Sequence, residues 1–433
     1  MKRLSALLLI LLCALPLKAQ KEEITKTGLN FGPLPAVAFD ADKGFQYGAL
    51  LQIFNYGNGE NYPNYNSKMY MEYSRFTKGS QLIQFRYDDK YLIPMVRWSS
   101  AFRAIIDKAY DFYGFNGYAT NYDATQMSPF YRYARNEFLF KSDFIGKITD
   151  NLNWMAGLYA SYYKLGSIDY ESINKGKADE KKFPTDMPTL YDAYKASGVI
   201  SAKEADGGFS SGARLGLEYD SRDKEGAPTR GIWADAHVLL APFSETPFYR
   251  YSLTWRQYFP LIDNDVLTFA YRLNYEGTFG SQVPFYALSY ISVVGEQIDK
   301  EGMGGADTGR GLPRCRVVGK DMATYVAELR WRFLRFQLWN QNIALALNVF
   351  SDGVMVTRGI DMTALPTNLK TLFPTAPNDV VLASGTDESL HATLGGGFRF
   401  IMNQNFIVRA EYGKPFNKQD GNGALYIGLG YLF

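Results

Sequence analysis

Strand-like segments with one continuous apolar face recur along this chain, and they constrain its fold more than any other feature. In one segment, alternate positions place Tyr251, Leu253 and Trp255 on one face, while Arg250 and Arg256 lie on the other. Successive side chains of a strand point to opposite faces, so this pattern predicts a strand with one apolar and one polar face. Two further segments alternate in the same way, residues 266–278 and 424–433.

Two architectures accommodate such strands. In a soluble β-sandwich or propeller the apolar face packs on a second sheet, whereas in a transmembrane barrel it meets lipid and the polar face lines the lumen. The chain has 32 Tyr and 30 Phe among 433 residues, and its mean hydropathy is −0.22. Aromatic girdles and low mean hydropathy are typical of membrane barrels, and Tyr and Trp fall near the expected strand ends. We therefore predict an all-β, transmembrane antiparallel β-barrel.

The start of the chain has the pattern of an export signal. Lys2 and Arg3 precede an apolar run over residues 7–15, and Ala19 ends a short segment that resembles a cleavage site. No later run reaches the roughly 18 apolar residues that a membrane-spanning helix needs. The expected organisation is a signal peptide over 1–19, a short periplasmic tail over 20–34 and a barrel over 35–433, in the outer membrane of a Gram-negative bacterium.

The charge and the cysteine content argue against a nucleic-acid-binding protein and against one stabilised by disulfides. The net charge of +2 falls to −1 when the three basic residues of the predicted signal are removed, which argues against a nucleic-acid partner. The mature chain keeps only Cys315, so it has no internal disulfide. The histidines have no second metal ligand at a recognisable spacing, and we expect neither a metal site nor a cofactor.

The lengths of the connections test the barrel independently. With a short first strand over 36–40, the segments amount to about sixteen strands, an even number as in bacterial barrels. From Tyr131 onward, short and long connections alternate, which predicts short turns on the periplasmic side and long loops outside. Loop 57–66 breaks this rule, as a long connection on the periplasmic side. The short turns are expected at Asp150, Asn264, Gln341 and Asn403, and the long loops over 168–207 (with a short helix at 189–196), 280–321 and 357–388.

A glycine-rich segment without periodicity contains the most distinctive motif, Gly309-Arg310-Gly311-Leu312. Alternation places Glu328 on the polar face of the strand that follows, and Asp352 on the polar face of the next. We predict that Arg310 folds into the barrel and pairs with Asp352 and Glu328, since such a charge-assisted pair would tether the loop in the lumen. From spacing alone, a solvated loop arginine explains this residue equally well.

Several motifs resemble the carboxy-terminal barrel of the BamA/TamA superfamily, also called the bacterial surface antigen family. That family has an Arg-Gly dipeptide in a lumenal loop, a Glu-Leu-Arg strand after it and a strand end with a lumenal aspartate. The last motif is one residue shorter here between Asp and Gly. The similar residues are Arg310-Gly311, Glu328-Leu329-Arg330 and Phe350-Ser351-Asp352-Gly353, together with a hairpin motif that includes Tyr219, Asp220, Arg222, Asp223 and Gly231.

The last strand carries two further signals. Glycine weakens strand pairing, and Gly428 and Gly430 lie in this strand. The resemblance implies a labile seam between the first and last strands that opens sideways to lipid. An alternative is that the glycines make room for the inward loop. Tyr431 and the terminal Phe433 resemble the sorting signal that is read when such barrels are inserted.

The resemblance implies a role in outer-membrane protein assembly or insertion, in translocation or in lipid handling. Family members that insert or secrete proteins carry periplasmic polypeptide-transport-associated domains, for which the predicted tail leaves no room. We therefore expect a barrel-only, monomeric form that contacts outer-membrane lipid and works with accessory proteins.

Two other functions stay open. A passive pore would use lumenal charges for selectivity. An outer-membrane lipase would use Ser210, in the G-x-S-x-G pattern of residues 208–212. That pattern needs a strand–turn–helix elbow and a nearby histidine, whereas here it leads into a strand, so we assign no catalytic residue and expect no enzyme.

Overall fold

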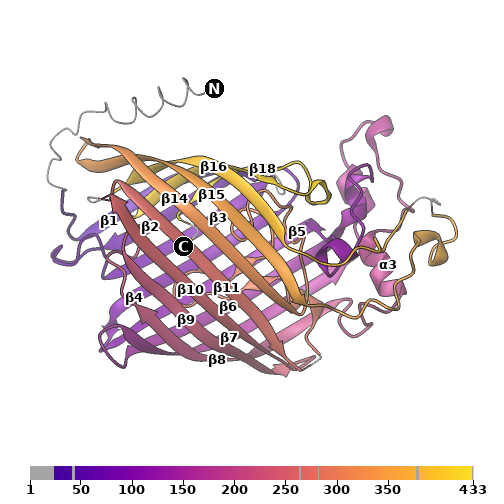
Figure 1. Ribbon diagram of the computed structural model, residues 1–433, viewed down its shortest axis with the longest axis horizontal. Helices are drawn as coiled ribbons and strands as arrows, with labels where there is room; N and C mark the ends of the chain where they lie inside the picture. The colour runs from indigo at the N-terminus through magenta and orange to yellow at the C-terminus, as the bar shows by residue number, and fades with distance from the viewer. Residues whose placement is uncertain (1–23, 41–43, 263–264, 281, 377–379, 432) are drawn as a thin grey trace.

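The computed structural model describes residues 24–40, 44–262, 265–280, 282–376, 380–431 and 433. In this part of the chain sixteen strands close into an antiparallel barrel, and β1 completes the ring against β18 (Figure 1). Strands β12 and β13 form a separate small sheet, so β11 pairs with β14. The predicted barrel of about sixteen strands is confirmed. The predicted signal peptide lies outside the described residues.

The barrel strands are β1 Leu29–Asp40, β2 Gly44–Asn55, β3 Ser67–Phe76, β4 Gln81–Ile93, β5 Val96–Asp111, β6 Arg132–Lys147, β7 Leu152–Gly166, β8 Gly207–Asp220, β9 Gly231–Ser244, β10 Phe248–Ile262, β11 Leu267–Phe279, β14 Asp321–Leu338, β15 Gln341–Arg358, β16 His391–Met402, β17 Phe406–Pro415 and β18 Ala424–Leu429. The loops contain β12 Tyr290–Ile291, β13 Lys300–Glu301 and the helices α2 Tyr170–Asn174 and α3 Leu190–Ala196.

Alternation sorts the side chains of each strand between the outer surface and the lumen. In β10, Leu253 and Trp255 are 48% and 42% exposed, whereas Arg250 and Arg256 are 5% and 3% exposed. The apolar side chains therefore form the outer wall, and the charged ones fill the interior. This arrangement suits a bilayer outside and a polar lumen inside, as the sequence pattern predicted.

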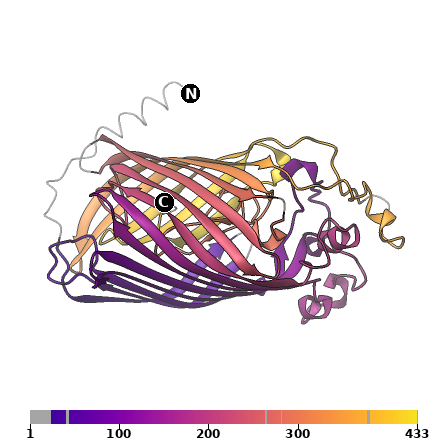
Figure 2. The same ribbon diagram turned by 90° about the horizontal axis from the view of Figure 1, so that it is seen from below.

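The connections separate into two ends, which we call the turn end and the loop end. Strands β14 and β15 meet at the turn end through Trp339 and Asn340, and β16 and β17 through Asn403 and Gln404, all with positive φ. Two successive positive φ angles are typical of type I′ hairpins, which match the twist of paired strands. The long connection between β7 and β8, which holds α2 and α3, projects from the opposite end (Figure 1, Figure 2). The predicted turn at Asn264 lies outside the described residues.

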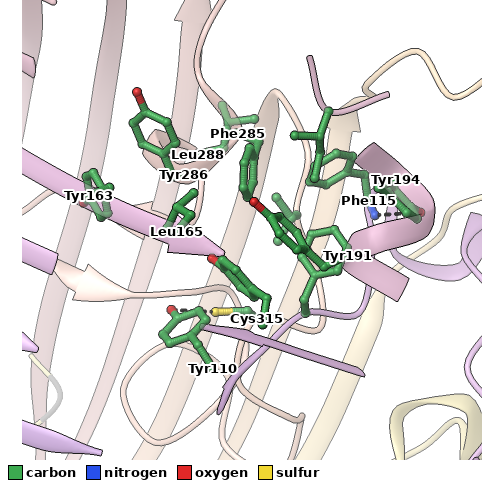
Figure 3. Close-up of a cluster of buried hydrophobic side chains, with 14 of the residues drawn as sticks. Tyr110, Phe115, Tyr163, Leu165, Tyr191, Tyr194, Phe285, Tyr286, Leu288 and Cys315 are labelled. Atoms are coloured by element: carbon green, nitrogen blue, oxygen red, sulfur yellow. Dashed lines mark hydrogen bonds between the residues drawn. The ribbon is translucent and has the colours of Figure 1, made fainter. Parts of the chain in front are cut away.

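Aromatic packing joins the segments of the loop end. Helix α3 begins after Thr189, whose side chain forms a capping box with Asp192, in agreement with the helix expected there. Its buried Tyr191 and Tyr194 pack against Phe285 and Phe115 from loops far away in the sequence (Figure 3). Because each ring buries a large apolar area, the cluster fixes these loops relative to one another.

Two predicted strand limits are wrong. Strand β1 begins at Leu29 rather than near residue 36, and residues 24–28 are the only described ones before it. Strand β18 ends at Leu429 rather than at the last residue. Gly430 then adopts a φ of 77°, a left-handed conformation that turns the chain inward. In both views the C-terminus lies within the outline of the barrel (Figure 1, Figure 2).

No helix in the described part of the chain is long and apolar enough to span a membrane.

The closed ladder predicts resistance to detergent, because every strand is hydrogen-bonded on two sides except where the ring closes. The protein extracted in detergent should migrate faster on a dodecyl sulfate gel before boiling than after it. Equal mobility in both lanes, together with solubility in the absence of detergent, would contradict the barrel.

Candidate functional site

Arg310 lies in the loop between β11 and β14, which folds into the lumen, and its side chain is fully buried. Nε and Nη2 donate to Oδ2 and Oδ1 of Asp352, each at 2.8 Å, and Nη1 donates to Oε1 of Glu328 at 2.6 Å. The backbone N–H of Arg310 also donates to Asp352 Oδ2 at 2.9 Å. The two parallel bonds to Asp352 form the fork geometry that makes arginine–carboxylate pairs strong. The structure thus brings together the three residues paired in the sequence analysis.

The pairing belongs to a larger network that sequence reasoning missed. Glu328 also accepts hydrogen bonds from Arg330 Nε at 2.7 Å and Arg399 Nη2 at 2.9 Å. Glu411 receives Arg399 Nη2 at 2.6 Å and lies 3.1 Å from Arg310 Nη1. Arg399 and Glu411 lie on the polar faces of β16 and β17, and that alternation was the only available signal.

The acids decide the charge state of the loop arginine. Burial by itself would lower the pKa of Arg310, but Asp352, Glu411 and Glu328 together raise it well above its ordinary value. The guanidinium also lies over the ring of Phe350, 3.5 Å from its centroid. Arg310 therefore remains a cation inside the barrel.

The rest of the motif allows the loop to approach the wall. Gly311 has a φ of 99°, and a Cβ there would lie 2.6 Å from the carbonyl carbon of Gly413 in β17. Leu312 is fully buried, in a cluster that includes Val354. Its carbonyl oxygen accepts a hydrogen bond at 3.2 Å from Tyr426 of β18. Gly309, also in the motif, is buried, and a Cβ there would lie 3.1 Å from a methyl group of Val354. The motif therefore contacts the last two strands as well as β15.

Replacing Arg310 by Ala should loosen the lumenal loop around this residue. Three buried carboxylates would lose a partner, and breaking such pairs costs about 3–5 kcal/mol. We expect trypsin to cut loop 282–320 in intact cells, at basic sites such as Lys300 and Arg314. Arg75→Ala, which removes an exposed arginine from the outside of β3, is the matched control. Arg310→Lys should give intermediate protection because it keeps the charge but loses the fork. Full protection in Arg310→Ala would contradict the tether.

The ring closes weakly between β1 and β18. Among the described residues these strands register at two positions, Phe39 with Ile427 and Asp40 with Tyr426. The rest of β1, Leu29–Ala38, pairs with β2 on its other side and registers with no residue of β18. We call this junction the seam. Its paired part lies toward the loop end, so its unpaired part lies toward the turn end.

The alternation predicted that the terminal residues continue the outer apolar face of β18. This prediction is wrong. Phe433 is only 4% exposed and packs with Trp233 and Tyr258 in the lumen. Its carbonyl oxygen accepts a hydrogen bond from Arg330 Nη2 at 3.2 Å, and Tyr431 lies under the same guanidinium, 4.5 Å away. The inward turn at Gly430 explains this placement. The tail therefore joins the network that holds Arg310.

Residues 110–433, more than half of the chain, match the model of the Omp85 superfamily domain. The chain belongs to the Omp85 superfamily. Its fold is similar to BamA from Haemophilus ducreyi lacking POTRA domains 1–3, at 17% identity and a TM-score of 0.52 over 94% of this chain and 70% of that one. CdiB from Escherichia coli aligns at 10% identity and a TM-score of 0.50, over 94% of this chain and 63% of that one. No curated protein matches the chain.

Membership in this superfamily confirms the predicted resemblance. It also identifies the chain as a β-barrel of the outer membrane, because the membrane setting follows from the family. At these identities the two solved structures establish the fold alone.

The hairpin motif of this Omp85 barrel organises the turn between β8 and β9. Arg222 donates to both carboxylate oxygens of Asp220, at 2.9 and 2.7 Å. Asp223 accepts hydrogen bonds from the backbone N–H groups of Thr229 and Arg230 at 2.9 and 3.1 Å. Gly231 has a φ of 102°. The outward Tyr219, 38% exposed, takes no part in these bonds. The turn is thus fixed by its own side chains.

Residues 24–28 and loop 56–66 form a strap across the turn end of the seam. The Ile24 backbone exchanges two hydrogen bonds with the Asn342 side chain, at 3.0 and 2.9 Å. Asn405 Nδ2 donates to the Tyr56 hydroxyl at 2.9 Å and to the Pro63 carbonyl at 2.7 Å. The strap therefore connects the β1–β2 side of the seam to the β14–β15 and β16–β17 turns.

Asn342→Ala removes two of the hydrogen bonds between the strap and the β14–β15 turn and leaves the one from Lys26 Nζ to the Asn340 carbonyl. Each lost hydrogen bond is worth about 1 kcal/mol, so global stability should change little. Hydrogen exchange should accelerate in β18 and along Leu29–Ala38, measured by mass spectrometry in detergent. Asn121→Ala removes one comparable side-chain bond, to Val381, from a loop far from the seam, and it should leave seam exchange unchanged. Equal exchange in all three proteins would contradict the strap.

The structure does not bring together the two parts of the lipase hypothesis, Ser210 and a histidine. Ser210 lies within strand β8 and is buried, so the pattern does not form an elbow. His237 instead contacts Ser292 Oγ at 2.9 Å and Asp235 Oδ2 at 3.2 Å, and Arg214 Nη2 donates to the same Ser292 oxygen at 3.1 Å. The contacts hold the lumenal loop at Ser292. In the described residues no group of three or more His, Cys, Asp or Glu is arranged to hold a metal ion.

Proposed function

We propose that this Omp85 barrel takes part in outer-membrane protein assembly or translocation by opening at its seam. The observation that carries the proposal is the short pairing between β1, Leu29–Asp40, and β18: among the described residues, β18 registers with β1 only at Phe39 and Asp40. Unpaired backbone groups are costly in hydrocarbon, several kcal/mol each, so such an edge tends either to pair or to avoid lipid. An extended client segment can satisfy it by adding a strand.

The proposal also orients the barrel, and with it the seam, in the membrane. We place the turn end in the periplasm and the loop end outside the cell, so the unpaired part of β1 faces the side from which clients arrive. The strap of residues 24–28 and 56–66 then guards this entrance. The predicted partners are outer-membrane lipid and periplasmic or outer-membrane accessory proteins, with the barrel itself monomeric.

The Arg310 network supports a gated rather than an open lumen. Loop 282–320 crosses the interior and is held at Arg310, and the aromatic cluster packs the segments of the loop end together (Figure 3). A passive pore would need this space to be free. The network also reaches the seam strands, through Tyr426 of β18 and through Arg409 of β17, which pairs with Asp307 of the loop at 2.5 Å.

Depletion of the protein tests this proposal. With the gene under a repressible promoter, outer-membrane proteomics should show a selective loss of other barrels or of surface proteins, at least several-fold, before growth slows. Re-expression of the wild type should restore them, whereas Arg310→Ala should not. The Arg75→Ala protein is the matched control and should restore them fully.

Conductance separates the pore from this proposal. The purified barrel in a planar bilayer should conduct poorly and erratically, because loop and aromatic cluster occupy the lumen. Steady, ion-selective conductance with an unchanged outer-membrane proteome after depletion would overturn the proposal and favour a pore.

A further inference from the structure

A cavity of about 630 Å³ lies inside the barrel beside the seam. Consecutive residues line it on both seam strands, 35–39 of β1 and 426–431 of β18 and the tail. In a continuous wall only alternate residues face the interior. Here outward Val37, 57% exposed, and inward Ala36, 3% exposed, line the same cavity. The cavity therefore passes between the two strands and reaches the lipid-facing surface.

Two bases of the inner wall of this cavity lie outside the ion pairs formed by the described residues. Lys300 and half-buried Arg86 both line it, and in the described chain neither makes an ion pair with a carboxylate. Arg86 lies over the Tyr70 ring at 4.1 Å, and its buried Nε has no acceptor in the part of the chain that the structure describes. Nearby Arg272 is 2% exposed, and its Nε and Nη2 also have no acceptor among the described residues. Buried donors normally have acceptors, so the unsatisfied donors of Arg86 and Arg272, next to Lys300, indicate a place for an anion.

The acids of the same wall are already satisfied. Glu72 accepts hydrogen bonds from Gln46 and Ser74 at 2.5 and 2.6 Å, and from the hydroxyl of Tyr70. Glu218 accepts from Trp233 Nε1 at 2.9 Å. The other acids of the wall pair with bases: Glu225 with Lys90, Glu296 with Lys68, Asp299 with Lys141, Glu301 with Arg135 and Asp307 with Arg409.

The surroundings of Lys300 are electropositive. Burial lowers its pKa to about 8, and Arg409, Arg86 and Arg272 contribute to the lowering, against the opposing effect of Asp307. An anion bound beside these groups would relieve their mutual repulsion. Arginine and lysine are the side chains that proteins use to hold phosphate.

We propose that this cavity binds the phosphate headgroup of a membrane lipid at Arg86 and Lys300, with the acyl chains leaving between β1 and β18. Two features favour an amphiphile: the bases lie inside, and the opening is framed by apolar residues such as Val37 and Leu429. The volume is within the usual range of small-molecule sites, about 300–1,000 Å³. The proposal rests on the proposed function for the seam and deepens it, by naming lipid as a ligand of the gate.

Native mass spectrometry of the delipidated barrel in detergent tests the site with three probes. These are dioleoylphosphatidylglycerol, dioleoylglycerol, which has the same tails without phosphate, and inorganic phosphate. The phosphatidylglycerol should bind the wild type about tenfold more tightly than dioleoylglycerol, since one charge-assisted contact is worth roughly 1.5–3 kcal/mol. Equal binding of the two lipids would overturn the proposal.

Removing the charges of Arg86 and Lys300 tests whether these residues bind the phosphate. Arg86→Gln combined with Lys300→Gln should weaken phosphatidylglycerol binding about tenfold and leave dioleoylglycerol unchanged. Lys181→Gln, in an exposed loop, is the control and should bind like the wild type. Unchanged phosphatidylglycerol binding in the double variant would overturn the proposal. If the double variant fails to fold, judged by heat-dependent gel mobility, Lys300→Gln alone tests the site, because Lys300 makes no ion pair with any described residue.

Filling the opening separates the two sources of phosphate. Gly428 lines the cavity at the seam, and a Cβ there would meet only the Arg409 side chain, no closer than 3.5 Å. Gly428→Leu should therefore fold, block lipid entry and leave inorganic phosphate binding intact. If instead only inorganic phosphate binds the wild type, the ligand is the free ion and the lipid assignment is overturned. These measurements need no client protein, so their failure is distinct from an unchanged proteome after depletion.

Discussion

The glycine-rich part of the lumenal loop depends on one buried cation. Arg310 is fully removed from solvent, and it remains charged because Asp352, Glu328 and Glu411 surround it. Removing one member of a buried ion pair strands the others, so these residues act as a unit. The unit fastens a loop to strands β14, β15 and β17 at one point. Other contacts hold the same loop elsewhere, including the pairs of Arg314 with Asp107 and Asp111 and the contacts of His237 and Arg214 with Ser292.

Much of the fold follows from alternation, and the exceptions have physical causes. The apolar outer faces, the polar lumen and the strand number all follow from period-2 patterning, because each inward residue is flanked by outward ones. The start of β1 was missed because Pro33 and Pro35 interrupt its pattern. Proline is tolerated at a sheet edge, and an unpaired edge is what β1 presents to β18. The end of β18 was missed because the alternation continues past Gly430, where a left-handed φ ends the strand.

The candidate site was predictable only in part. The faces of β14 and β15 placed Glu328 and Asp352 in the lumen, and the motif around Arg310 indicated what would meet them. The contributions of Arg399 and Glu411 depend on how β16 and β17 curve around the same loop, and no single strand encodes that. The inward position of Phe433 likewise depends on the bases that receive it, Arg330 and Arg272. Polar faces can be assigned from sequence, whereas partners across a barrel require its closure.

The shared acid Glu328 links the tethered loop to the C-terminal tail inside the lumen. It holds Arg310 of the loop at 2.6 Å and Arg330 at 2.7 Å, and Arg330 in turn holds the carbonyl of Phe433. Withdrawal of the tail would leave Arg330 without one acceptor, and withdrawal of the loop would leave Glu328 with fewer donors. Each change alters the electrostatic field felt by the other, because groups in direct contact are not energetically independent. The weakly paired seam and the tethered loop therefore share one network, and movement at either is expected to loosen the other.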